Sequence, residues 1–85
     1  MSALRVALAD DQALVRAGLR ALLERLGIVI ALEADDGAAL LAQLQATTVD
    51  VVLSDIRMPG TDGIQALQAL RARGDTTPLL LLTTF

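Results

Sequence analysis

The chain has 85 residues, a formal net charge of −3 and 54% hydrophobic residues, with no Cys, no His and no Lys. These absences exclude disulfides, thiolate or imidazole metal ligands and histidine acid–base chemistry, so carboxylates, hydroxyls and Arg remain as reactive groups. Because the sequence has no long apolar span, no cleavable leader and no basic patch, we expect one cytoplasmic domain over residues 1–85, without a second domain and without membrane or nucleic-acid contacts.

The first apolar segment, residues 4–9, is a nearly continuous aliphatic run. Such a run is typical of a strand buried on both faces of a parallel sheet. It ends at Asp10 and Asp11, after which apolar residues recur at helical spacing. We expect Asp11 or Gln12 to begin this helix and Gly27 to end it.

A second strand is predicted over residues 28–34, followed by a turn at residues 35–37 and a short helix. The third strand is predicted over residues 49–55 and ends at Asp55. Residues 57–63 then form a loop, as their Pro and Gly content indicates.

The last part of the chain repeats this alternation. Asp62 is expected to cap a third helix and Gly74 to end it. Pro78 introduces a final strand-like run over residues 79–85. The resulting string, βαβαβαβ, predicts an α/β fold with a parallel sheet and helices on both of its faces.

Acidic residues follow two of the predicted strands. Asp10 and Asp11 follow the first strand and Asp55 ends the third, and in open parallel sheets ligands bind at the carboxyl ends of strands. Three neighbouring carboxylates either hold protons or bind a cation, and oxygen ligands favour Mg²⁺. The alternatives are that Asp10 and Asp11 only cap the first helix, and that Asp55 is only a turn residue.

Three motifs occur at the ends of predicted strands: Ala9-Asp10-Asp11, the stretch from Ser54 to Gly63, and Leu82-Thr83-Thr84. Together they resemble the receiver domain of two-component response regulators over the whole chain. The last two motifs are most similar to those of the NarL/FixJ (LuxR-type) subfamily, which are transcription regulators. The resemblance implies a flavodoxin-like (receiver) doubly wound parallel sheet of strand order 2-1-3-4. It also implies a receiver truncated after the fourth strand, without the fourth helix, fifth strand and fifth helix.

The resemblance also implies roles for individual residues. Asp55 would accept a phosphoryl group from a sensor histidine kinase, with Mg²⁺ as the cofactor. Asp11 and Asp55 would bind the metal directly, Asp10 would bind it or hold its water, and the backbone carbonyl of Arg57 would complete the ligands. Thr83 would turn its hydroxyl toward the phosphoryl group, although it could also be an ordinary strand residue. A carboxylate nucleophile assisted by Mg²⁺ is sound chemistry for phosphoryl transfer.

Three functions follow as hypotheses. The first is a phospho-accepting signalling domain, at most catalysing its own phosphorylation and dephosphorylation, which regulates transcription through an absent C-terminal DNA-binding domain. The second is a signalling-impaired fragment, since the family's Lys is missing, that forms a homodimer or larger oligomer through an exposed strand from Leu79 to Thr84. The third is a Mg²⁺-dependent phosphohydrolase, which is disfavoured because Arg57 stands where that class needs a second Asp after Asp55.

Overall fold

A parallel four-stranded sheet forms the centre of the structure, a computed structural model that describes residues 3–82. Strands and helices alternate strictly along the chain, as the sequence predicts. The elements are β1 (Arg5–Ala9), α1 (Ala13–Arg25), β2 (Val29–Ala34), α2 (Gly37–Leu44), β3 (Val51–Asp55), α3 (Gly63–Ala72) and β4 (Leu79–Leu82). The strand order is β2-β1-β3-β4, and every pair is parallel. The expected fold class and strand order are therefore confirmed.

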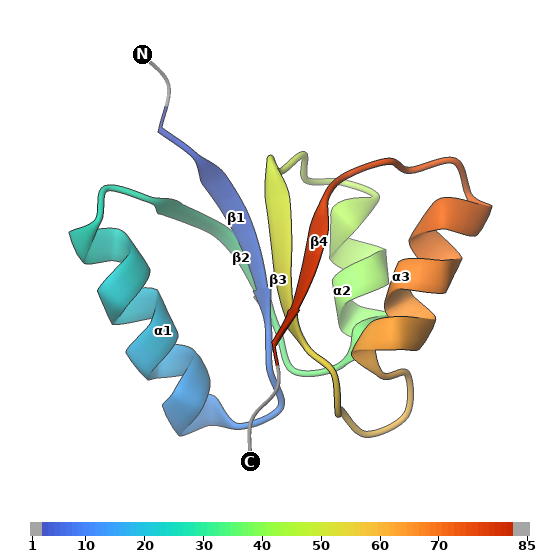
Figure 1. Ribbon diagram of the computed structural model, residues 1–85, viewed down its shortest axis with the longest axis horizontal. Coiled ribbons are helices and arrows are strands. Elements are labelled where there is room, and N and C mark those ends of the chain that lie inside the picture. Colours follow the sequence, from blue (N-terminus) through green and yellow to red (C-terminus); the bar gives the residue numbers. More distant parts are fainter. Residues whose placement is uncertain (1–2, 83–85) are drawn as a thin grey trace.

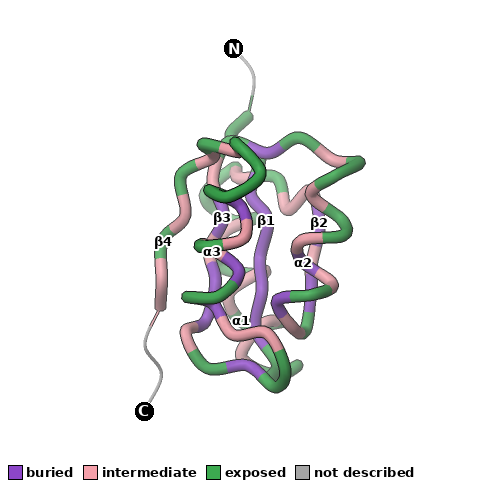
Figure 2. The backbone as a smooth tube through the Cα atoms, turned by 90° about the vertical axis from the view of Figure 1, so that its right-hand side faces the viewer, coloured by how far each residue is buried: buried purple, intermediate pink, exposed green. Residues whose placement is uncertain are grey.

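Helices lie on both faces of the sheet, with α1 on one face and α2 and α3 on the other (Figure 1). The two central strands are the most buried elements, and β4 lies at the side of the molecule (Figure 2). Val6, Ala7 and Leu8 of β1 are at most 1% exposed. This burial on both faces explains why β1 is aliphatic from Val6 to Ala9 instead of alternating with polar residues.

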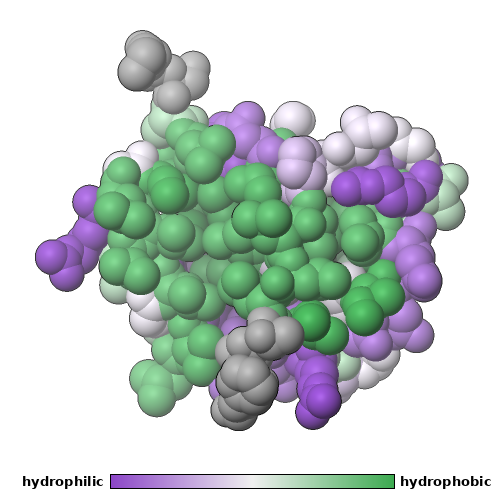
Figure 3. All heavy atoms as spheres, in the orientation of Figure 1, coloured by the Kyte–Doolittle hydropathy of each residue, from purple (hydrophilic) through white to green (hydrophobic). Residues whose placement is uncertain are grey.

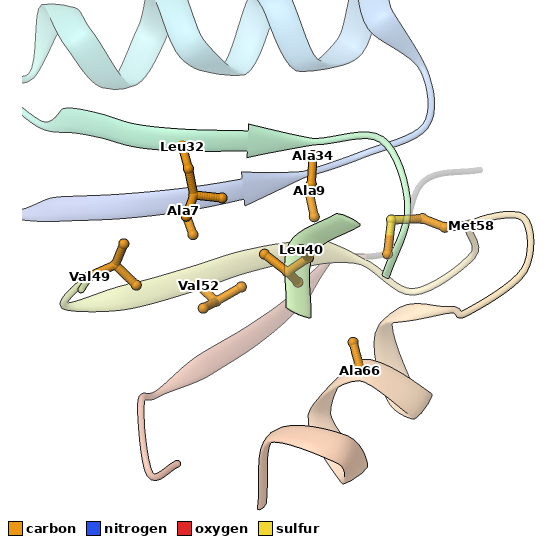
Figure 4. Packing of buried hydrophobic residues seen from close by; sticks show 9 residues of the cluster. All are labelled: Ala7, Ala9, Leu32, Ala34, Leu40, Val49, Val52, Met58 and Ala66. Carbon is orange, nitrogen blue, oxygen red and sulfur yellow. The ribbon is translucent and has the colours of Figure 1, made fainter. Parts of the chain in front are cut away.

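The main core lies between the sheet and the helices α2 and α3 (Figure 4). Small and aliphatic side chains fill it: Ala7, Ala9, Leu32, Ala34, Leu40, Val49, Val52, Met58 and Ala66. The opposite face is covered less completely, because α1 contains no fully buried residue. The apolar residues of α1 do lie at helical spacing, but Leu14 near its start remains 86% exposed.

Several predicted strand ends differ from the observed ones by one or two residues, and a hydrogen bond explains one of these differences. β3 begins at Val51, and the residue before it, Asp50, bonds to Arg5 twice: its carboxylate accepts the Arg5 N–H at 2.7 Å and its own N–H donates to the Arg5 carbonyl at 2.8 Å. β2 begins at Val29 because the N–H of Ile28 donates to a carbonyl of α1 at 3.1 Å and so belongs to the end of that helix. Gly27 follows α1 with a φ of 83°, which only glycine adopts easily. The last residues of the run predicted over 79–85 lie outside the described part of the chain.

Candidate functional site

Three carboxylates meet at the carboxyl ends of the two central strands. Asp55 is the last residue of β3, and Asp10 and Asp11 follow β1, which is paired with β3. One carboxylate oxygen from each Asp lies within 4.8 Å of the other two. Asp10 and Asp55 are 1% and 3% exposed, whereas Asp11 is exposed to solvent. The prediction that these acids converge is confirmed.

Two hydrogen bonds fix Asp10 in the turn between β1 and α1. The N–H of Asp10 donates to the carbonyl of Ala34 at 3.0 Å, and its Oδ1 accepts the N–H of Gln12 at 2.8 Å. Gln12, not Asp10 or Asp11, is the N-cap residue of α1. The interpretation of both acids as helix caps is therefore wrong, and the expectation that Asp11 or Gln12 begins the helix is met by Gln12.

Arg16 of α1 also contacts this turn, a role that its residue type does not predict. Its Nη1 donates to the backbone carbonyl of Asp10 at 2.6 Å, and its Nε donates to Glu33 at 3.2 Å. Because every residue has a backbone carbonyl, the sequence does not indicate which carbonyl an Arg side chain contacts. The only available signal was the position of an Arg in the early part of the helix that follows the acids.

The loop between β3 and α3 is closely packed behind Asp55. The Ser54 hydroxyl donates to the carbonyl of Asp55 at 2.9 Å, and the N–H of Gly63 donates to the carbonyl of Ile56 at 2.9 Å. A Cβ on Gly63 would lie only 2.3 Å from the Asp55 carbonyl oxygen. Arg57 lies in this loop with an exposed side chain, and the role of its backbone carbonyl stays a prediction.

Two loops at this edge of the sheet are joined to each other. The N–H of Gly37 donates to the carbonyl of Thr61 at 2.9 Å, and a Cβ on Gly37 would lie 2.4 Å from that oxygen. The preceding residue, Asp36, is the N-cap of α2 and accepts the N–H of Ala39 at 2.7 Å. The turn predicted over residues 35–37 is found at residues 35 and 36, whereas Gly37 is already the first residue of α2.

The predicted phosphoryl-sensing residue, Thr83, lies outside the described residues. Leu82, the residue before it, pairs with Asp55 in the register of β3 and β4.

The donor set of the cluster fits a hard divalent cation. Within residues 3–82, the salt bridges involve other acids, and none includes Asp10, Asp11 or Asp55. Clustered carboxylates repel one another unless they gain protons or a cation, and three oxygen donors suit Mg²⁺. The three carboxylates thus give the site a negative charge, and no ion pair among the described residues neutralises that charge.

The strand order and the acidic cluster agree with a family match that covers most of the chain. Residues 6–85 match the response regulator receiver domain, and the chain belongs to this family. The expected resemblance to response regulators is confirmed. Within residues 3–82, no helix combines the length and the apolar character needed to cross a membrane.

Among individual relatives, the probable transcriptional regulatory protein NarL of Mycobacterium tuberculosis (strain ATCC 25618 / H37Rv) is 44% identical over 80 residues, which cover 93% of this chain and 37% of that protein. The uncharacterized transcriptional regulatory protein YxjL of Bacillus subtilis (strain 168) is 40% identical over 83 residues, which cover 96% of this chain and 38% of YxjL. The chain thus spans less than two fifths of the length of these relatives.

Solved structures agree with this assignment. The signal receiver domain of NarL from Mycobacterium tuberculosis superposes with a TM-score of 0.93 at 41% identity, covering 100% of this chain and 69% of that one. A LuxR-family two-component response regulator from Aurantimonas sp. SI85-9A1 superposes with a TM-score of 0.91 at 34% identity, covering 99% of this chain and 61% of that one. The expected similarity to the NarL/FixJ (LuxR-type) group is confirmed.

Proposed function

We propose that this receiver module accepts a phosphoryl group on Asp55, with Mg²⁺ held by Asp10, Asp11, Asp55 and the backbone carbonyl of Arg57. One observation carries the proposal: a carboxylate oxygen from each of the three acids lies within 4.8 Å of the other two, at the end of the two central strands. A cluster built only for helix capping would not need the buried Asp55, which ends β3, whereas the other two acids follow β1.

The reaction requires little beyond positioning and charge. A carboxylate oxygen of Asp55 forms a bond to phosphorus, the bond between phosphorus and the donor atom breaks, and the electron pair leaves with the donor group, which is then protonated. Bound Mg²⁺ would offset the negative charge of Asp55 and of the phosphoryl oxygens. Because the N–H of Ile56 already donates to the carbonyl of Leu82 at 3.1 Å, the backbone donors available to the phosphoryl group are those of the residues after Ile56.

The partners follow from the family and are part of the same proposal. The phosphoryl donor is a sensor histidine kinase, and Thr83 senses the modified Asp55. The relatives are named as transcriptional regulatory proteins and are more than twice as long as the matched segment. We therefore propose that the full-length cytoplasmic protein regulates transcription, with DNA bound by a domain outside residues 1–85.

The test is intact mass spectrometry after incubation with Mg²⁺ and acetyl phosphate. We expect one phosphate adduct on the wild-type chain and none on Asp55→Asn. Asp50→Asn is the matched control, because Asp50 precedes the first residue of β3, at the opposite end from Asp55, and its carboxylate accepts the Arg5 N–H. This variant should keep the adduct.

Two results would contradict the proposal. An adduct that survives Asp55→Asn would place the phosphoryl group on another residue. A wild-type chain that stays unmodified, whether Mg²⁺ is present or removed with a chelator, would exclude phospho-acceptance by this module.

A further inference from the structure

We infer that Arg16 is a positioning residue that holds the turn carrying Asp10 and Asp11 in the geometry that binds Mg²⁺. The inference rests on the proposed function and adds to it a residue outside the acidic cluster. Arg16 acts through a backbone carbonyl and contacts neither the metal nor the phosphoryl group.

Arg16 connects the turn after β1 to the neighbouring strand β2. One end of its guanidinium donates to the carbonyl of Asp10 at 2.6 Å, and its Nε donates to Glu33 of β2 at 3.2 Å. The side chains of Arg16 and Glu33 are only 22% and 28% exposed, so the pair is partly shielded from water. A planar guanidinium suits this task, because its donors point in fixed and different directions.

Glu33 is itself held in place from two sides. Its carboxylate also pairs with Arg20, one turn further along α1. Its backbone carbonyl accepts the side-chain amide of Gln43 from α2 at 2.9 Å. Glu33, which pairs with Arg16, is therefore held by residues of both α1 and α2, and it is not a free surface carboxylate.

The carbonyl that Arg16 holds belongs to the peptide joining Asp10 to Asp11. Fixing that peptide restricts the directions in which both carboxylates leave the backbone. The Asp10 side chain is restrained separately by the N–H of Gln12 at 2.8 Å. Mutual repulsion of the acids favours movement of the exposed Asp11 away from the buried Asp55, and the contact from Arg16 resists this movement.

Charge and positioning predict opposite results for the removal of Arg16. Taking away a positive charge near a cation site should by itself tighten Mg²⁺ binding. Releasing the turn should weaken it, because outer contacts that orient metal ligands typically change metal affinity by about 10- to 100-fold. The direction of the change in affinity therefore separates the two effects.

Arg20 provides the matched control. It lies on the same helix, loses the same charge on substitution and pairs with the same Glu33. Among residues 3–82 it pairs with Glu24 and Glu33 and does not contact the Asp10 carbonyl. We expect Arg16→Gln to weaken Mg²⁺ binding roughly tenfold in isothermal titration calorimetry. We expect Arg20→Gln to bind Mg²⁺ as tightly as the wild type or slightly more tightly. Arg16→Lys keeps the charge without the planar group and should lie between Arg16→Gln and the wild type.

A second measurement needs no metal. Amide hydrogen exchange followed by NMR should show faster exchange at Gln12 in Arg16→Gln than in Arg20→Gln, since the N–H of Gln12 is bonded to the Asp10 side chain. Circular dichroism confirms that each variant is folded at the temperature used. If Arg16→Gln proves unfolded, Arg16→Lys decides the matter through the same two readouts.

Three outcomes overturn the inference. A folded Arg16→Gln protein that binds Mg²⁺ at least as tightly as the wild type would show that only its charge matters. Equal weakening in Arg16→Gln and Arg20→Gln would assign the effect to Glu33 instead. Failure of the wild-type chain to bind Mg²⁺ would overturn the proposed function itself, and the positioning role would fall with it.

Discussion

The position of Asp55 depends on a residue that has no side chain. Gly63, the first residue of α3, faces the end of β3 so closely that an added Cβ would lie 2.3 Å from the Asp55 carbonyl, 2.9 Å from Leu81 and 3.1 Å from the Ser54 hydroxyl. The first of these contacts is with backbone, which cannot move aside as a side chain can. Gly63 therefore determines how near α3 can approach the candidate acceptor.

Gly63→Ala should lower the free energy of unfolding by about 2–3 kcal/mol, which is within the usual range for overpacking. Denaturation by urea measures this loss. Gly18→Ala is the control, because a Cβ at Gly18 in α1 meets nothing within 4 Å and should raise stability by about 0.5–1 kcal/mol. Equal stability of Gly63→Ala and the wild type would contradict the close approach.

At the scale of elements, the three helices begin in different ways. α3 begins with a capping box, in which Asp62 accepts the N–H of Gln65 at 2.8 Å and the Gln65 side chain accepts the N–H of Asp62 at 2.9 Å. α1 begins at Gln12 without a side-chain cap. The start of α3 is thus secured locally, and this helix follows the loop that carries Arg57.

Asp62→Ala should therefore destabilise the protein by about 1 kcal/mol, since it leaves the N–H of Gln65 without its partner. Thermal unfolding followed by circular dichroism measures the change. Gln12→Ala makes the matched comparison and should have little effect, because no cap hydrogen bond is lost. If both variants lost the same stability, the capping box would not be the cause.

At the scale of the whole molecule, the two sides of the sheet are covered unequally. α2 and α3 cover one face, whereas α1 alone lies on the other (Figure 1). Hydrophobic side chains cover much of the face seen in Figure 3, which has the orientation of Figure 1, where β4 lies in front. In β4, Leu79 packs against the core while Leu80, on the opposite face, is 57% exposed. Within residues 3–82, β4 pairs with β3 alone.

An apolar edge strand of this kind can pair with another chain. We expect the isolated polypeptide of residues 1–85 to form a homodimer or larger oligomer in size-exclusion chromatography with light scattering. Leu80→Lys should shift it toward the monomer, because a charged residue on an edge strand opposes pairing. A monodisperse wild-type monomer at high concentration would contradict this expectation.

Local sequence patterns were enough to predict the order of the elements and the placement of acids at strand ends. Both depend on local features: aliphatic runs, helical spacing, and turn residues such as Gly27 and Asp62. The strand order and the roles of the acids came from the resemblance to a family and not from periodicity. The carboxylates of Asp10 and Asp11 could be expected near Asp55 because the carboxyl ends of parallel strands meet at one edge.

The contacts around that site depend on how distant segments of the chain pack together. The bond from Arg16 to the Asp10 carbonyl, its anchor at Glu33, and the approach of Gly63 to the Asp55 carbonyl join residues whose types do not specify a partner. Burial also depends on tertiary packing: Leu8 is fully buried and Leu14 is 86% exposed, although both are leucines. The physical reason is that periodicity and turn chemistry act over a few residues, whereas contacts and burial arise where distant segments pack together.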